Sequence, residues 1–173
     1  YQPIRPPTAP QRRTLGQGTD QFPPILRRAI ALIEENIADP LTVPEIADEL
    51  DLSQRQLERL FHKGLGCSVV RFGTLVRLQH ARVLLIATKL SVREIATATG
   101  FNALSHFASA FRKCFDRRPS DYRQGWAPTE PTPSWPGTLT GYLDTLQQRA
   151  TRAVRSKTSS FDFVSSSGEP REE

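Results

Sequence analysis

The sequence predicts an all-α protein in which two helix-turn-helix units are joined by a long helix, about seven helices in all. Two observations support this fold class, and a third bears on the partner of the protein. The stretch Leu41–Phe61 is repeated as Leu90–Phe111, which indicates a duplicated supersecondary unit. Residues 68–87, between the two copies, carry apolar side chains at helical spacing. Positive charge is concentrated from Leu52 to Arg123, where the second helix of each unit is expected.

The first element is a helix that enters at Pro23-Pro24 and runs toward Asn36. Proline suits the start of a helix, where a backbone N–H would lack an intrahelical partner. Pro40 prevents this helix from continuing into the first unit.

The two copies keep a common register. Five residues of the first copy reappear 49 positions later: Leu41, Val43, Glu45, Ile46 and Ala47 correspond to Leu90, Val92, Glu94, Ile95 and Ala96. One extra residue then shifts the offset to 50, which aligns Leu57 with Phe107, Phe61 with Phe111 and Lys63 with Lys113.

The first helix of each unit has a defined start. Thr42 and Ser91 are predicted N-caps, and Glu45 and Glu94 stand three residues later, where each completes a capping box. The turns are predicted at residues 51–53 and 100–102.

The turn residues suit a sharp change of direction. Gly100 can adopt the left-handed conformation that such a turn requires, and Asp51 tolerates that conformation better than most residues. Ser53 and Asn102 are expected to cap the second helix of each unit.

The second helices have an apolar stripe and a polar outer face. The stripe consists of Leu57, Leu60 and Phe61 in the first copy and of Phe107, Ala110 and Phe111 in the second. The outward residues are Gln54, Arg55, Glu58, Arg59 and His62, and then Ala103, Ser105, His106, Ser109 and Arg112. Arginine and glutamine can bond base edges in a major groove, whereas hydroxyls and helix N-termini can hold phosphates. The alternative is an ordinary solvated face.

Between the units, Ser68–Ala87 is predicted to form a helix capped by Ser68 after Gly66. At about 1.5 Å per residue it spans roughly 30 Å, close to the ~34 Å that separates successive major grooves on one DNA face. Gly73 weakens this helix by about 1 kcal/mol relative to alanine unless a close contact requires it. Arg71, Arg77 and Arg82 are either phosphate contacts or surface residues whose stems lie along the helix.

The flanks are predicted to be less ordered than residues 22–125. Residues 1–21 contain four prolines and favour an interdomain linker or a natural N-terminal arm. Because the chain has no methionine, we expect a fragment of a longer protein. Residues 116–123 suggest a short closing helix capped near Ser120. Residues 126–173 are a Pro- and Ser-rich tail, within which 140–155 form an amphipathic helix or a solvated, partly helical segment.

The charge pattern favours double-stranded DNA as the partner. Residues 22–51 carry two basic against seven acidic side chains, whereas residues 52–123 carry thirteen basic against four acidic. Clustered basic side chains supply the sequence-independent attraction to phosphates. The main alternative is a basic helical protein-interaction module without sequence-specific DNA readout.

The residues give little support to an enzyme. Cys67, Cys114, His62, His80 and His106 are the only cysteines and histidines, and no pair has metal-motif spacing. A Gly-rich phosphate loop is absent as well. We therefore expect no catalytic residue, no metal and no cofactor. The apolar runs are too short for a membrane span, which predicts a cytoplasmic protein.

The second copy also carries a recognisable combination of residues: Ile95-Ala96, Gly100-Phe101, Ser105-His106-Phe107, Phe111-Arg112-Lys113 and Phe115, followed by residues 119–123. With these, Leu41–Arg123 resembles the homeodomain-like DNA-binding domain of the AraC/XylS family of transcription factors. The run Leu57–Phe61 and the later Ser105-His106-Phe107 most resemble the GlxA-type branch. In that branch the DNA-binding domain follows an amidotransferase-like, PfpI-type domain.

The resemblance implies roles for individual residues. Bases would be read by Arg55, Glu58 and Arg59 from the first copy and by Ser105, His106 and Ser109 from the second. Phosphates would be held by Ser53, Gln54, Asn102, Arg112, Lys113 and Arg71. Family members often have a longer side chain in place of Ser109, so base readout by the second copy is expected to be weaker. For His106 a local structural hydrogen bond remains the alternative. The resemblance also implies contact with RNA polymerase and places any effector in an upstream domain.

Overall fold

The computed structural model describes residue 19, residues 21–125, and Gln148 and Arg152. Within these residues it contains seven α-helices and no strand: α1 (Pro24–Glu35), α2 (Val43–Glu49), α3 (Gln54–Leu65), α4 (Val69–Ala87), α5 (Val92–Ala98), α6 (Leu104–Phe115) and α7 (Pro119–Gly125). The predicted all-α fold class is confirmed. Nearly all of the predicted linker at 1–21 and of the tail helix at 140–155 lies outside the described residues.

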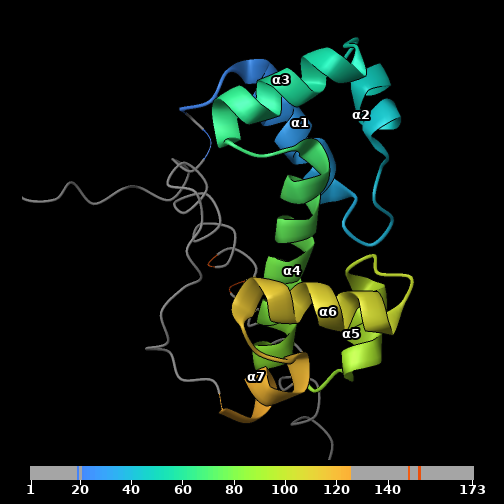
Figure 1. The fold of residues 1–173 in the computed structure, drawn as a ribbon, viewed down its shortest axis with the longest axis vertical. Coiled ribbons are helices and arrows are strands. Elements are labelled where there is room, and N and C mark those ends of the chain that lie inside the picture. The colour runs from blue at the N-terminus through green and yellow to red at the C-terminus, as the bar shows by residue number, and fades with distance from the viewer. Residues whose placement is uncertain (1–18, 20, 126–147, 149–151, 153–173) are drawn as a thin grey trace, which may run out of the picture.

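Helix α4 joins two subdomains, and Figure 1 shows α1 to α3 at one of its ends and α5 to α7 at the other. The helix has 19 residues and is therefore about 28 Å long. As predicted, Ser68 caps it by accepting a hydrogen bond from the backbone N–H of Arg71 at 3.1 Å, after Gly66 in the left-handed region. This helix sets how far apart the two units stand.

The core is continuous through α4, which buries apolar side chains against both subdomains. In the first subdomain the rings of Phe61 and Phe72 meet edge to face, with centroids 5.4 Å apart. In the second, Phe111 lies 4.6 Å from Phe115 and 5.6 Å from Tyr122. Aromatic pairs of this geometry stabilise a core beyond the area that they bury.

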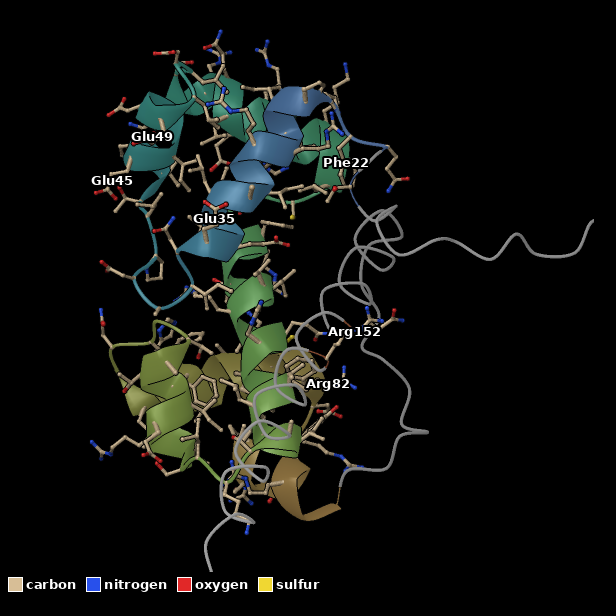
Figure 2. The ribbon with its side chains drawn as sticks, turned by 180° about the vertical axis from the view of Figure 1, so that it is seen from behind. Phe22, Glu35, Glu45, Glu49, Arg82 and Arg152 are labelled. Carbon is tan, nitrogen blue, oxygen red and sulfur yellow. The ribbon has the colours of Figure 1, made fainter. Side chains whose placement is uncertain are left out.

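Two arginines of α4 depart from the surface role predicted for them. Arg82 is only 2% exposed and holds its guanidinium 5.5 Å from the rings of both Phe115 and Tyr122 (Figure 2). Arg77 is half-buried and lies over the ring of Phe101. Both predictions were wrong because the long side chains pack on aromatic faces of the second subdomain, where cation–π attraction stabilises them. Arg71 is exposed, as a phosphate contact would need to be.

The two helix-turn-helix units have the same lengths. Helices α2 and α5 each have 7 residues, and α3 and α6 each have 12. The predicted capping boxes are confirmed: Thr42 pairs with Glu45, and Ser91 with Glu94. The turn residues Asp51 and Gly100 have φ angles of 53° and 77°, which confirms the left-handed conformation predicted at both turns.

The extra residue of the second unit lies in its turn. In the first unit Ser53 caps α3, whereas α6 is preceded by Ala103 in extended conformation, without a side-chain cap hydrogen bond among the described residues. The prediction that Asn102 is the cap was wrong. Asn102 is the inserted residue that changes the offset from 49 to 50, and Ala103 takes the place of Ser53.

The closing helix begins at Pro119, one residue before the predicted cap at Ser120. Proline lacks the N–H that would be unpaired in a first turn, so the chain can enter the helix at Pro119 without a capping side chain. Tyr122 of this helix is 3% exposed and lies on the core.

Candidate nucleic-acid interface

Helix α3 presents a row of polar side chains opposite its buried stripe. Ser53 and Gln56 form a capping box in which the backbone N–H of Ser53 donates to Gln56 Oε1 at 2.8 Å. Leu57, Phe61 and Leu65 are buried against the core. The predicted groove-facing residues Gln54, Arg55, Arg59 and His62 are exposed, and Lys63 beside them is exposed too.

Glu58 departs from this row. Its carboxylate accepts a hydrogen bond from the backbone N–H of Val69, the first residue of α4, at 3.3 Å. His62 Nε2 lies 3.9 Å from the same carboxylate. Glu58 is half-buried, and its carboxylate is already engaged in pairing the first N–H of α4.

The second unit supports this interpretation of Glu58. At the offset of 50, Ala108 stands in place of Glu58 and Pro119 in place of Val69. Proline has no N–H to donate, so no acceptor is needed at Ala108. The carboxylate is present where a helix start has a free donor, and absent where it has none. This geometry favours a structural role for Glu58 over the base-reading role that the resemblance implies.

Helix α6 differs from α3 in the chemistry of its outer face. Its buried stripe consists of Phe107, Phe111 and Phe115. Apart from His106, the side chains exposed in its first turns are small or apolar: Leu104, Ser105 and Ser109. The basic residues Arg112 and Lys113 are exposed in its last turn.

His106 lies at the corner between the turn and α6. Its ring meets Phe101 edge to face with centroids 5.7 Å apart, while the residue as a whole is exposed. Phe101 itself is 4% exposed and also packs against Phe107. The imidazole ring thus packs on Phe101 with one edge and is accessible to solvent elsewhere.

Leu104 is a residue of this surface that sequence reasoning missed. It is 38% exposed at the start of α6. At the offset of 50 it corresponds to Gln54, which stands in the exposed polar row of α3. Apolar side chains read DNA by contact with the 5-methyl group of thymine. The sequence contained a signal for this residue, because the equivalent position in the other copy is polar.

The remaining phosphate-contact candidates are accessible. Asn102 is exposed in the second turn, and Ser53 is exposed next to Gln54. The Ser53 hydroxyl oxygen already accepts a hydrogen bond from the N–H of Gln56 at 3.1 Å, which leaves its O–H free to donate to a phosphate.

Acidic side chains gather on α2, away from these basic rows. Figure 2 shows Glu45 and Glu49 on the outer side of the first subdomain. Hydrogen bonds from the backbone and hydroxyl of Thr42 hold the pKa of Glu45 below its ordinary value, and Ser91 does the same for Glu94. Both carboxylates therefore stay ionised at neutral pH.

The two thiols are poorly suited to chemistry. Both cysteines are reduced; Cys67 is buried and Cys114 partly so. Burial raises the pKa of Cys67 and raises that of Cys114 to about 12. A thiol protonated at neutral pH is a weak nucleophile and metal ligand.

The described part of the chain lacks two further classes of site. It contains no group of three or more His, Cys, Asp or Glu side chains placed to hold a metal ion. None of its helices combines the length and apolarity that a membrane span requires.

Comparison with known proteins gives consistent matches. A family model described as a helix-turn-helix domain matches residues 46–125. The chain is 43% identical over 108 residues to the HTH-type transcriptional regulator GbdR of Pseudomonas aeruginosa, covering 62% of this chain and 29% of GbdR. It is 35% identical over 121 residues to the HTH-type transcriptional regulator GlxA of Rhizobium meliloti, covering 70% of this chain and 37% of GlxA. The chain thus spans well under half the length of these regulators.

A solved structure matches the helical part closely. It is a transcriptional regulator from Chromobacterium violaceum whose description names an AraC-type DNA-binding domain. The two chains are 38% identical with a TM-score of 0.58, and the match covers 62% of this chain and 96% of that one.

Proposed function

The chain belongs to the AraC-type helix-turn-helix family of transcriptional regulators, and from this premise we propose that residues 22–125 bind a bipartite DNA site by placing α3 and α6 in adjacent major grooves. The observation that supports this most is the pair of matched units at opposite ends of α4, each with an accessible polar face on its second helix.

The length of α4 fits this arrangement. It is about 28 Å long, and successive major grooves on one DNA face are ~34 Å apart. Because one unit packs on each end of α4, the two recognition helices would reach two grooves from one monomer. A second copy is then unnecessary for contact with both half-sites.

The two recognition helices would contribute differently. Arg55 and Arg59, both exposed, would bond base edges, since the guanidinium of arginine is suited to bidentate pairing with guanine. On α6, Ser105, His106 and Ser109 offer shorter polar contacts, and Leu104 adds an apolar one. The phosphate contacts would be Ser53, Gln54 and Arg71 in the first part and Asn102, Arg112 and Lys113 in the second.

The organisation of the whole protein is part of the proposal. The similarity to GlxA and the run Leu57–Phe61 favour the GlxA-type branch, with an amidotransferase-like domain upstream and residues 1–21 as the linker. An effector would bind to that upstream domain. Contact with RNA polymerase would use a surface that faces away from DNA, and the protein would act in the cytoplasm.

The experiment is selection of duplexes from a random pool by the 173-residue chain at physiological ionic strength. The enriched duplex is then titrated against a scrambled duplex. A bipartite motif with half-sites about 10 bp apart would support the proposal. Equal, steeply salt-dependent binding to both duplexes would contradict it and favour a basic protein-interaction module.

A further inference from the structure

The two subdomains touch each other directly, apart from their connection through α4. In both figures the loop between α1 and α2 lies beside the turn between α5 and α6. The contact is close at Gly100. A Cβ atom there would overlap the carbonyl oxygen of Ile37 and come within 2.7 Å of Pro40 Cγ. The turn of the second unit thus fits against the first subdomain only because residue 100 is glycine.

Arg77 of α4 holds the same turn from the other side. Its guanidinium donates a hydrogen bond to the carbonyl oxygen of Gly100 at 2.9 Å. The same group lies over the ring of Phe101, 4.5 Å from the ring centroid. Two consecutive residues of the turn are therefore bound to one side chain of the connecting helix.

Arg77 also reaches the first subdomain. It lines a cavity of about 130 Å³ together with Asn36, Pro40, Leu41 and Val43. Arg77 therefore lies where α4, the loop between α1 and α2, and the second turn meet.

The equivalent turn of the first unit has no such environment. Asp51 is exposed, although its backbone has the same left-handed conformation as Gly100. Another arginine of α4, Arg82, makes its ring contacts with Phe115 and Tyr122, inside the second subdomain. Arg77 and Gly100 thus differ from their nearest counterparts in bridging the two subdomains.

We propose that Arg77 and Gly100 form a spacing lock that fixes the distance and rotation between α3 and α6 and so selects the number of base pairs between the half-sites. The inference rests on the proposed function. Adding one base pair moves a half-site by ~3.4 Å along DNA and turns it by roughly 35°, since one turn holds 10–10.5 bp. To reach the shifted half-site, the second unit would have to break the hydrogen bond from Arg77 to the Gly100 carbonyl oxygen. It would also have to lose the contact between Gly100 and Pro40.

The test is a series of duplexes that carry the selected half-sites at spacings one and two base pairs shorter or longer than the optimum. For the unchanged chain, a one-base-pair change should weaken binding about tenfold, the worth of one charge-assisted hydrogen bond. In Arg77→Ala the same change should weaken binding no more than about twofold, with each half-site's base preference retained. An unchanged tenfold penalty in Arg77→Ala would overturn the lock.

Arg82→Ala is the matched control, because it removes the same side chain from the same helix within one subdomain. It should weaken binding equally at every spacing. A flattened spacing profile in Arg82→Ala as well would overturn the assignment to Arg77, since general loosening of the second subdomain would then explain the result.

A second measurement works even if Arg77→Ala is poorly folded. Spin labels at Lys63→Cys in α3 and Ser109→Cys in α6, with Cys67 and Cys114 replaced by alanine, report the distance between the recognition helices without DNA. The lock predicts a single narrow distance distribution, whereas a broad one would overturn it. If selection returns no bipartite motif, the proposed function fails; a narrow distribution would still show that the subdomains are fixed relative to each other.

Discussion

The two helix-turn-helix units share a scaffold and differ in what they expose. Both have capping boxes, left-handed turn residues and second helices of equal length. The first carries Gln54, Arg55 and Arg59 toward the start of its second helix, where the other has Leu104, Ser105 and Ser109. Since the N-terminal part of a recognition helix enters the groove, the first unit is the better equipped to read bases. The second places its basic residues in the last turn.

The turns differ in a complementary way. The turn of the first unit is exposed at Asp51, whereas that of the second is covered at Gly100 by the first subdomain and Arg77. The comparison shows that both copies keep the caps of their first helices and the left-handed turn residues, whereas the cap and the exposed residues of their second helices differ. In the proposed function, the first copy would contribute most of the sequence readout, and the second would contribute anchoring and a fixed position relative to the first.

The largest expected effect comes from the enclosed turn. Gly100→Ala should lower the free energy of unfolding by about 1–2 kcal/mol for a side chain in the left-handed region, and by a further ~1–3 kcal/mol for the overlap with Ile37 and Pro40. Gly66→Ala is the matched control. Its φ is 73°, yet no described atom lies within 4 Å of the added Cβ, so only the first cost applies. Urea denaturation compares the two variants, and equal losses would show that the second turn is no more enclosed than Gly66.

The next effect tests the division of readout. Arg59→Ala should cost ~1–3 kcal/mol on the selected duplex relative to a scrambled one. Ser109→Ala, at the equivalent position of α6, should cost less than about 0.5 kcal/mol. Fluorescence titrations on both duplexes measure the difference. Equal losses on selected and scrambled DNA for Arg59→Ala would remove its base-reading role.

A smaller effect tests Leu104. If it contacts a thymine methyl group, replacing that thymine with deoxyuridine should weaken binding by about 0.8 kcal/mol, the worth of one buried methyl-sized group. The same replacement should cost the Leu104→Ala variant nothing, since the contact is already lost. Each thymine of the second half-site is exchanged in turn. Equal losses in both proteins at every thymine would exclude Leu104 from readout.

An effect of similar size, but of opposite sign, is expected outside both units. Gly73→Ala should stabilise the chain by up to ~1 kcal/mol, because alanine favours a helix interior. The nearest described atom to the added Cβ is Ile33 Cγ2 at 3.9 Å, an ordinary contact. Half-site preferences should stay unchanged. A lower melting temperature would mean that the α1–α4 contact at this position is tighter than the structure indicates.

Local chemistry made most of the scaffold predictable. Capping boxes, Gly100 and the Ser68 cap are signals within four residues of the feature that they produce, and each was predicted correctly. The errors arose where the outcome depended on distant residues. Asn102 was a reasonable cap by residue type, but the inserted residue moved the start of α6. The burial of Arg77 and Arg82 depends on rings of the second subdomain, which helical periodicity in α4 does not reveal.

The exposed residues of α3 and α6 were predictable where exposure depends on the same helix, and not where it depends on distant residues. Exposure of Arg55, Arg59, Ser105 and Ser109 follows from helical spacing relative to a stripe within the same helix. The engagement of Glu58 with Val69 joins residues eleven positions apart, across a turn. Only a comparison of both copies, with Ala108 and Pro119 in the second, makes that pairing visible in the sequence.

The most direct test of unequal units is a scan of the selected DNA site in which each base pair is replaced in turn and the loss of binding is measured. The account predicts penalties of ~1–3 kcal/mol per position in the half-site bound by α3. In the Arg59→Ala variant, the penalty should disappear at the base pair that Arg59 contacts. Penalties in the other half-site should be smaller. Equal penalties in both half-sites, or larger ones in the half-site bound by α6, would contradict the division of roles.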